Sequence, residues 1–315
     1  MAAPAASAAF WHGLLNLTSK LVKLVLVQSA RTVTGMSVRR YGVLFLAALL
    51  ISCGLSRDSG WAEQASAGGQ IFATYNVDLV GFSLGEFHLA IAFHGLQYEI
   101  EGNGQFSLLL GGLYRGGGIA ASTGKLTKAG PLPSTFTLRY EGGGKKEQRD
   151  MSFAGGAVSQ VSILPQKKQS RRRVPVSKEQ LVDVLDPLSA AFLHTRPNSP
   201  VCDDTLPVFD GRLRFNIVLT PKRADSVPKN APTNLSGPAA VCKAKFVPIA
   251  GHKPNNSGIK FMAETDQIEV WLASLPGTSM YVPYWIGVPT PLGRGSMTLT
   301  EIKITGSEPT SGLRP

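Results

Sequence analysis

An alternation of apolar with small or polar side chains is the feature that most limits what this chain can fold into. It is clearest in segment 86–93, where the apolar positions are Phe87, Leu89, Ile91 and Phe93. Successive side chains of a β-strand point to opposite faces of a sheet, so a period of two is typical of strands with one buried face. Short segments of this kind recur as far as residue 304, separated by turns rich in Gly and Pro.

Many short strands with little helix predict a mainly β fold, in which a strongly curved antiparallel sheet forms a half-barrel or open barrel with one or two packed helices. Glycines within the strands, such as Gly81 and Gly85, are typical of bulges and bends in curved sheets. Segment 221–238 is rich in Pro, Asn and Lys and is expected to be a loop. Besides 86–93, strands are expected over 119–128, 134–140, 145–153, 158–164, 213–219, 241–248, 259–263, 267–274, 281–288 and 296–304.

Two segments predict helix. The first is the apolar stretch 106–114, which ends at three glycines. The second begins at Ser177, where S-x-x-Q has the form of a capping box and an apolar face follows over 181–192. Pro187 is expected to kink this helix, with Asp186 capping its second part.

The segment from Met36 to Cys53 resembles a bacterial export signal. Arg39 and Arg40 form a short basic region, and Val43–Ile51 is an apolar run too short to span a bilayer permanently. A cut before Cys53 would allow lipid attachment to its thiol and make the protein a lipoprotein. A cut after Ala67, or after Ala62, would instead release a soluble periplasmic protein.

These segments divide the chain. Residues 1–35 precede the signal, and we expect Met36 to be the true start, which makes 1–35 a mis-assigned or disordered extension. A membrane-surface helix over 14–27 is the alternative for that stretch. Residues 36–67 are expected to be signal and tether, residues 68–306 a single β-rich envelope domain, and residues 307–315 a disordered tail.

The formal charge of +11 falls to +6 once the five basic residues of 1–53, a segment without acids, are removed. Much of the remaining excess lies in one run, and it is carried by Lys167, Lys168, Arg171, Arg172 and Arg173. Such a run can contact an anionic membrane surface, or it can simply be a solvated loop. Export argues against nucleic acid as its partner.

Cysteine usage fits an oxidising compartment. Apart from Cys53, the chain contains only Cys202 and Cys242, and an even pair in an exported protein predicts a disulfide. No CxxC motif is present and no His stands at ligand spacing from either residue, so we expect neither a metal site nor a cofactor.

Several motifs together resemble the bacterial family called domain of unknown function 3108. They are Tyr75 with Gly81 and Gly85, the Pro131-Leu132-Pro133 segment, VLDPLSA at 184–190, Cys202 before LPVFDGR at 206–212, and Val241-Cys242 before VPIAG at 247–251. The resemblance spans roughly residues 70–304. It implies an exported, single-domain, β-rich envelope protein without an assigned activity.

Within LPVFDGR, Asp210 and Arg212 are the most suggestive polar residues. The carboxylate can form a buried ion pair or contact a ligand, or it can serve a turn in which Gly211 takes a positive φ. No catalytic residue is assigned, because none of the downstream histidines stands in a nucleophile or metal motif. Those histidines are His88, His94, His194 and His252.

Aromatic residues near the C-terminus can line an apolar groove in a curved sheet, or they can be core. They are Phe261, Trp271, Tyr281, Tyr284 and Trp285. We therefore expect a non-enzymatic exported envelope protein that acts as a scaffold or binds a lipid or an envelope protein. The alternative is a periplasmic, hydrolase-like enzyme whose site has no recognisable motif.

Overall fold

The computed structural model describes residues 68–108, 114–166, 172–190, 193–194, 200–231, 233–275 and 280–306. The signal segment, Cys53 and the ends of the chain lie outside these residues. The strands are β1 Gln70–Leu79, β2 Phe82–His94, β3 Gln97–Leu108, β4 Tyr114–Thr127, β5 Gly130–Gly142, β6 Lys145–Ala154, β7 Ala157–Leu164, β8 Leu193–His194, β9 Asp204–Phe209, β10 Arg214–Ser226, β11 Pro238–Ala250, β12 Ile268–Ser274, β13 Met280–Thr290 and β14 Gly293–Thr305.

The strands form one antiparallel sheet, which confirms the predicted mainly β class. Its order is β7-β6-β5-β4-β3-β2-β1-β14-β13-β12-β11-β10-β9, and β8 pairs with β13 beside this path. β1 shows why the pattern gives a sheet: Ile71, Ala73, Tyr75 and Val77 are all buried, whereas the residues between them are more exposed.

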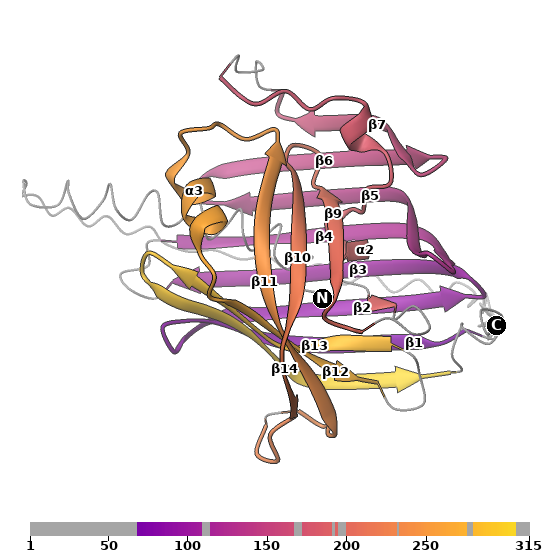
Figure 1. The fold of residues 1–315 in the computed structure, drawn as a ribbon, viewed down its shortest axis with the longest axis vertical. Coiled ribbons are helices and arrows are strands. Elements are labelled where there is room, and N and C mark those ends of the chain that lie inside the picture. Colours follow the sequence, from indigo (N-terminus) through magenta and orange to yellow (C-terminus); the bar gives the residue numbers. More distant parts are fainter. Residues whose placement is uncertain are drawn as a thin grey trace, which may run out of the picture.

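The sheet curls until its two halves face each other. Figure 1 shows β9, β10 and β11 crossing in front of the long strands β2 to β6 at a steep angle. The apolar residues of both halves belong to one core. Burial of this shared surface, which is the main favourable term in folding, therefore depends on both halves at once.

The sheet is not closed, because its edge strands β7 and β9 are not paired with each other in the described ladders. A non-strand segment lies in the gap. Val182 bridges to Ala157 of β7, and Leu185 bridges to Val208 of β9. We call this region, where residues 182–185 join the two edges, the seam.

The seam explains why the helix expected from Ser177 was largely wrong. The amide N–H of Ser177 does donate to Oε1 of Gln180, as the capping box predicts. However, the described part of 177–190 contains as helix only the 3₁₀ turn η1 (Glu179–Leu181) and the four-residue α2 (Pro187–Ala190). The chain between them is extended at Val182, because its backbone is bonded to the edges of the sheet instead of to a helix.

Three further expectations were wrong in part. Segment 106–114 is strand at both ends, since β3 runs to Leu108 and pairs with β4 from Tyr114; residues 109–113 lie outside the described part. Segment 259–263 belongs to helix α3 (Ser257–Glu264), whose N-terminus is capped by the side chain of Asn256. Segment 221–238 is not all loop, because β10 continues to Ser226. Among the described helices, none is long and apolar enough to cross a membrane.

Candidate functional site

Three of the motifs that carry the family resemblance, VLDPLSA, LPVFDGR and VPIAG, meet at the seam. The N–H of Leu185 donates to the carbonyl of Pro207 (2.8 Å), and the N–H of Phe209 donates to the carbonyl of Leu185 (2.9 Å). VLDPLSA and LPVFDGR are thus bonded to each other. VPIAG lies against the same region, because a Cβ added at Gly251 would be only 1.8 Å from the carbonyl oxygen of Arg212.

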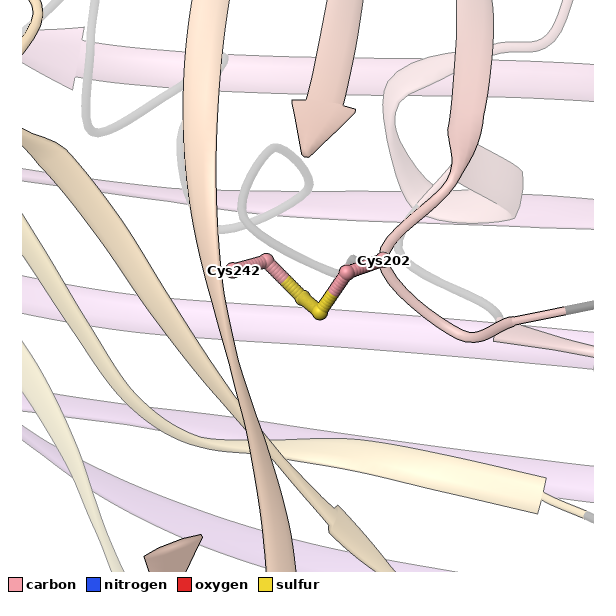
Figure 2. The surroundings of a disulfide bond; sticks show 2 residues. All are labelled: Cys202 and Cys242. Carbon is pink, nitrogen blue, oxygen red and sulfur yellow. A yellow bond between two sulfur atoms is a disulfide. The ribbon is translucent and has the colours of Figure 1, made fainter. Parts of the chain in front are cut away.

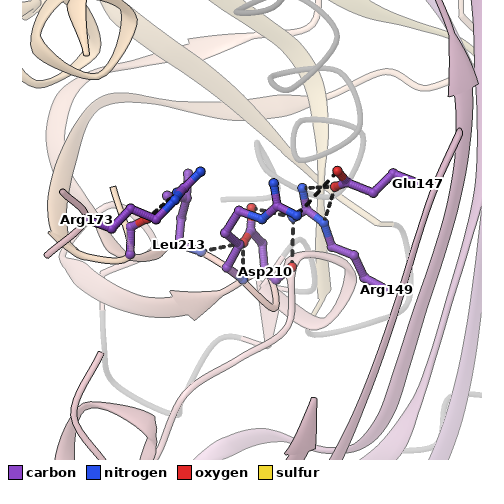
Figure 3. Close-up of polar contacts among 7 residues, drawn as sticks. Glu147, Arg149, Arg173, Asp210 and Leu213 are labelled. Atoms are coloured by element: carbon purple, nitrogen blue, oxygen red, sulfur yellow. Dashed lines mark hydrogen bonds and ion pairs between the residues drawn. The ribbon is translucent and has the colours of Figure 1, made fainter. Parts of the chain in front are cut away.

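Arg149 of β6 is the centre of this region. Its side chain is 1% exposed and pairs with two carboxylates, Glu147 at 2.6 Å and Asp210 at 2.9 Å. It also donates to the backbone carbonyl of Asp210 at 2.9 Å. Figure 3 shows the guanidinium between the two acids, so it links β6 with the turn that follows β9.

Asp210 serves the turn as well as the ion pair. Its Oδ1 accepts from the N–H groups of Arg212 (2.8 Å) and Leu213 (2.7 Å), while Gly211 has a φ of 88°. The turn chemistry and the buried ion pair, which the sequence presents as alternatives, therefore occur together. Arg212 pairs with Glu147 at 3.4 Å.

The surroundings shift the pKa values of Arg149 and Arg212 in opposite directions. Burial alone would lower the pKa of Arg149, but Asp210 and Glu147 raise it above its ordinary value. Burial, with Arg149 and Arg173 nearby, lowers the pKa of Arg212. Arg149 and Arg212 thus contact two carboxylates, and replacing Arg149 would remove the cation closest to both of them.

A second buried polar group holds α2 against the sheet. Oδ1 of Asp186 accepts from the N–H groups of Leu188 (2.8 Å) and Ser189 (3.0 Å), as the predicted cap requires. Its Oδ2 accepts from the hydroxyl of Ser122 on β4 at 2.8 Å. The Ser189 hydroxyl in turn contacts that of Tyr98 on β3 at 2.7 Å. Burial is the main reason that the pKa of Asp186 lies above its ordinary value.

An open hollow of about 1240 Å³ adjoins the Arg149 cluster through Glu147. Its walls come from β2 to β7 and include Gly104, Gly118, Tyr140, Glu147 and Arg115. Gly104 and Gly118, which are paired across β3 and β4, both line the hollow. Glu147 therefore belongs both to the hollow and to the buried ion cluster.

The predicted disulfide is confirmed. Cys202, which precedes β9, is bonded to Cys242 of β11, and the two residues are 4% and 0% exposed (Figure 2). Their separation of 40 residues makes the bond a substantial constraint on the unfolded chain.

The basic run is divided by the structure. Lys167, Lys168 and Arg171 lie outside the described residues, as does Cys53. Arg172 is exposed, whereas half-buried Arg173 donates to the carbonyl of Gly251. Arg173 thus holds its segment against Gly251 of VPIAG.

The histidines differ in their surroundings. Exposed His88 lies 3.6 Å from Glu86, and Nδ1 of His252 is buried without a hydrogen-bond partner. His94 is exposed, and the side chain of His194 is outside the described part. The described residues contain no group of three metal-ligating side chains.

The aromatic residues near the C-terminus are partly covered. Trp271 lies against Tyr284 and Trp285, with ring centroids 6.1 and 6.5 Å apart. The guanidinium groups of Arg223 and Arg294 lie over Trp271 and Trp285 respectively. Two ring faces of the expected groove are therefore already occupied by the protein itself.

Sequence reasoning missed Arg149 and Glu147, although a signal was present. Both alternate in phase with Met151 and Phe153 along β6, which are apolar. A charged residue at an inward position of a strand requires a buried partner. That rule calls for a buried acid elsewhere in the chain, and in the structure this acid is Asp210 of LPVFDGR.

Comparisons with known proteins give a family. No curated protein matches the sequence. One solved structure that it matches is a beta-barrel-like protein of domain of unknown function DUF1849 from Brucella abortus, which is 8% identical with a TM-score of 0.42, over 76% of this chain and 98% of that one. The family model described as protein of unknown function (DUF3108) matches residues 74–300. Since this range includes most of the chain and all of the seam, the protein belongs to the DUF3108 family.

Proposed function

We propose that this protein is an exported, non-enzymatic component of the bacterial cell envelope, anchored through Cys53, whose rigid curved sheet binds a lipid or an envelope partner. The observation that carries the proposal is the disulfide between Cys202 and Cys242. Structural disulfides form and persist in oxidising compartments and are rare in the cytosol. The bond therefore supports the export signal that ends at Cys53.

The hollow over β3 and β4 supports a binding role. Its volume of about 1240 Å³ is large enough for a small ligand or an acyl chain, and its walls combine Tyr140 with polar Glu147 and Arg115. Binding there would draw on glycine-rich backbone and a few charged groups. This chemistry suits a lipid with a polar head.

The hydrolase alternative has less support. A general base must reach the proton that it abstracts, yet Asp186 and Asp210 are 0% and 2% exposed and are fully engaged by backbone N–H groups, Ser122 and Arg149. Ser122 and Ser189 are equally buried, so a substrate has no route to either hydroxyl.

Intact-mass measurement tests the proposal on protein purified from its own envelope, with and without reductant. We expect a mature N-terminus at Cys53, the added mass of a diacylglyceryl group, and a mass increase on reduction. Native mass spectrometry of the same sample should reveal a retained lipid. Recovery of a cytosolic, reduced chain that keeps Met1 would refute the proposal.

A further inference from the structure

Two hairpin turns at one end of the sheet hold three apolar side chains in solvent. Val80 and Phe82, at the turn between β1 and β2, are 53% and 67% exposed, and Leu292, between β13 and β14, is 40% exposed. The turns touch, because the N–H of Val80 donates to the carbonyl of Arg294 at 2.9 Å. We call these three residues the turn patch.

Val80 is a poor choice for the turn itself. Val80 and Gly81 have φ values of 53° and 79°, so this two-residue hairpin needs positive φ at both central positions. Asn or Asp is preferred at the first position, whereas a β-branched residue there is strained. The side chain is half exposed and one of its methyl groups lies beside Gly293 of the neighbouring turn, so the backbone of its own turn does not account for valine at position 80.

Leu292 is likewise not required by its turn. The hydroxyl of Thr290 accepts from the N–H of Leu292 and donates to the carbonyl of Gly293. The turn between β4 and β5, at the opposite end of the sheet, has the same two bonds from Thr127. Its central residues are Lys128 and Ala129, so the same geometry accepts a charged and a small residue.

The charges beside the turn patch identify a suitable partner. Within two residues of the turns 80–81, 143–144 and 291–292, which lie at this end, are three basic side chains and two acidic ones. The basic ones are Lys145, Lys146 and Arg294, and the acidic ones are Asp78 and Glu141. Exposed apolar residues flanked by basic ones match the boundary between acyl chains and anionic headgroups.

We propose that the turn patch inserts into the surface of an anionic bilayer, with the surrounding basic side chains facing lipid phosphates. Trp285, whose ring lies under Arg294, is a residue type enriched at that depth. The proposal rests on the proposed function only for placing the protein beside a membrane. The surface itself is argued from the two turns.

An anchor at Cys53 is compatible with this orientation. β1 begins at Gln70 and runs for 10 residues to the turn patch, a length of roughly 33 Å. The chain from Cys53 to Gln70 spans at most roughly 55 Å when extended. The turn patch and the anchor can therefore reach the same bilayer.

Hydrogen exchange on the whole mature protein tests the surface. With vesicles of phosphatidylethanolamine and phosphatidylglycerol, we expect exchange in segments 79–83 and 290–294 to slow by about tenfold, because burial of one large apolar side chain is worth at least that factor in binding. Exchange in 94–97 and 127–130, at the opposite end, should not change. Vesicles without phosphatidylglycerol should protect less.

Matched variants separate the turn patch from general stickiness. V80N with F82S should remove the protection, whereas L96S, which replaces an exposed apolar residue at the opposite end (41% exposed), should keep it. Equal protection at both ends, or protection that persists in V80N/F82S, would overturn the proposal. Intact mass decides export separately: protection of the turn patch in a protein that proves to be cytosolic would leave this surface standing and remove the proposed location.

Discussion

At the scale of single residues, Arg149 is a charged side chain that is almost completely withdrawn from water. Its side chain is 1% exposed and faces Asp210 at 2.9 Å. Desolvating two charges costs several kcal/mol, and only the geometry of the pair repays it. Removing one partner should therefore lower the free energy of unfolding by more than the intact pair contributes to it.

A double-mutant cycle on this pair measures that asymmetry. R149M should lower the free energy of unfolding by about 3–5 kcal/mol, because it removes the cation that contacts the carboxylates of both Asp210 and Glu147. D210N keeps an oxygen for the turn while it removes the charge, so R149M/D210N should be more stable than R149M alone. Urea denaturation of the wild type, R149M, D210N and R149M/D210N gives the free energies of unfolding that the cycle compares.

The control for this cycle is the exposed ion pair between Lys146 and Glu141, which is 2.9 Å long with side chains 79% and 67% exposed. K146M should change the free energy of unfolding by less than about 1 kcal/mol. Costs of similar size for R149M and K146M would contradict the view that burial makes Arg149 important.

Val80 makes the opposite prediction, a gain in stability. V80N gives the hairpin a residue that readily adopts the φ of 53° found there, so the free energy of unfolding should rise by about 1 kcal/mol. Denaturant midpoints of V80N and the wild type test this. L96N, in a turn where residue 96 does not have positive φ, should bring no gain. A V80N protein that is more stable yet protected less by vesicles would separate folding from binding at this position.

At the scale of elements, α2 depends on Asp186 as the docking group for a helix of only four residues. Burial raises the pKa of Asp186 above its ordinary value of 3.8, so the folded protein holds this proton more tightly than the unfolded chain does. The resulting contribution to stability is present below pH 3.8 and is lost as pH rises through the raised pKa.

D186N removes this titration and preserves the geometry. The Asn carbonyl can accept from the N–H groups of Leu188 and Ser189, and its amide can donate to the hydroxyl of Ser122. The stability of D186N relative to the wild type should therefore rise as pH increases above 3.8, until Asp186 is fully ionised. Denaturation at a series of pH values tests the sign. D186A, which loses the cap, should lose about 1 kcal/mol or more throughout.

The elements also show how far the sequence could lead. Alternation predicted most strands, because the period of two between buried and exposed side chains can be read within each strand by itself. The helix expected from Ser177 failed because Val182 and Leu185 are bonded to the distant edges of the sheet. Nothing within residues 177–193 records the presence of those edges. Tertiary pairing of this kind overrides local propensity.

At the scale of the whole molecule, the same distinction applies to the candidate site. Asp210 was identifiable from its turn, and Cys202 with Cys242 from their even number. The meeting of LPVFDGR with Arg149 depends on how the sheet curls, which brings residues 61 positions apart into contact. The open sheet is thus joined at the seam by groups that no local pattern places together.

Because the two halves of the sheet share one core, the molecule should unfold as a unit even without its disulfide. C202S/C242S should lower the free energy of unfolding by about 4 kcal/mol, as expected for releasing a loop of 40 residues. Yet the ion pair between Arg149 and Asp210 still links β6 with the turn after β9, and α2 still packs into the core that both halves share. In a mature chain that begins at Cys53 and carries W61F, tryptophan fluorescence reports on Trp271 and Trp285 in the second half. Fluorescence and far-ultraviolet circular dichroism, which reports on all strands, should therefore give one coincident transition. If fluorescence changed first, the disulfide rather than the common core would be what holds the halves together.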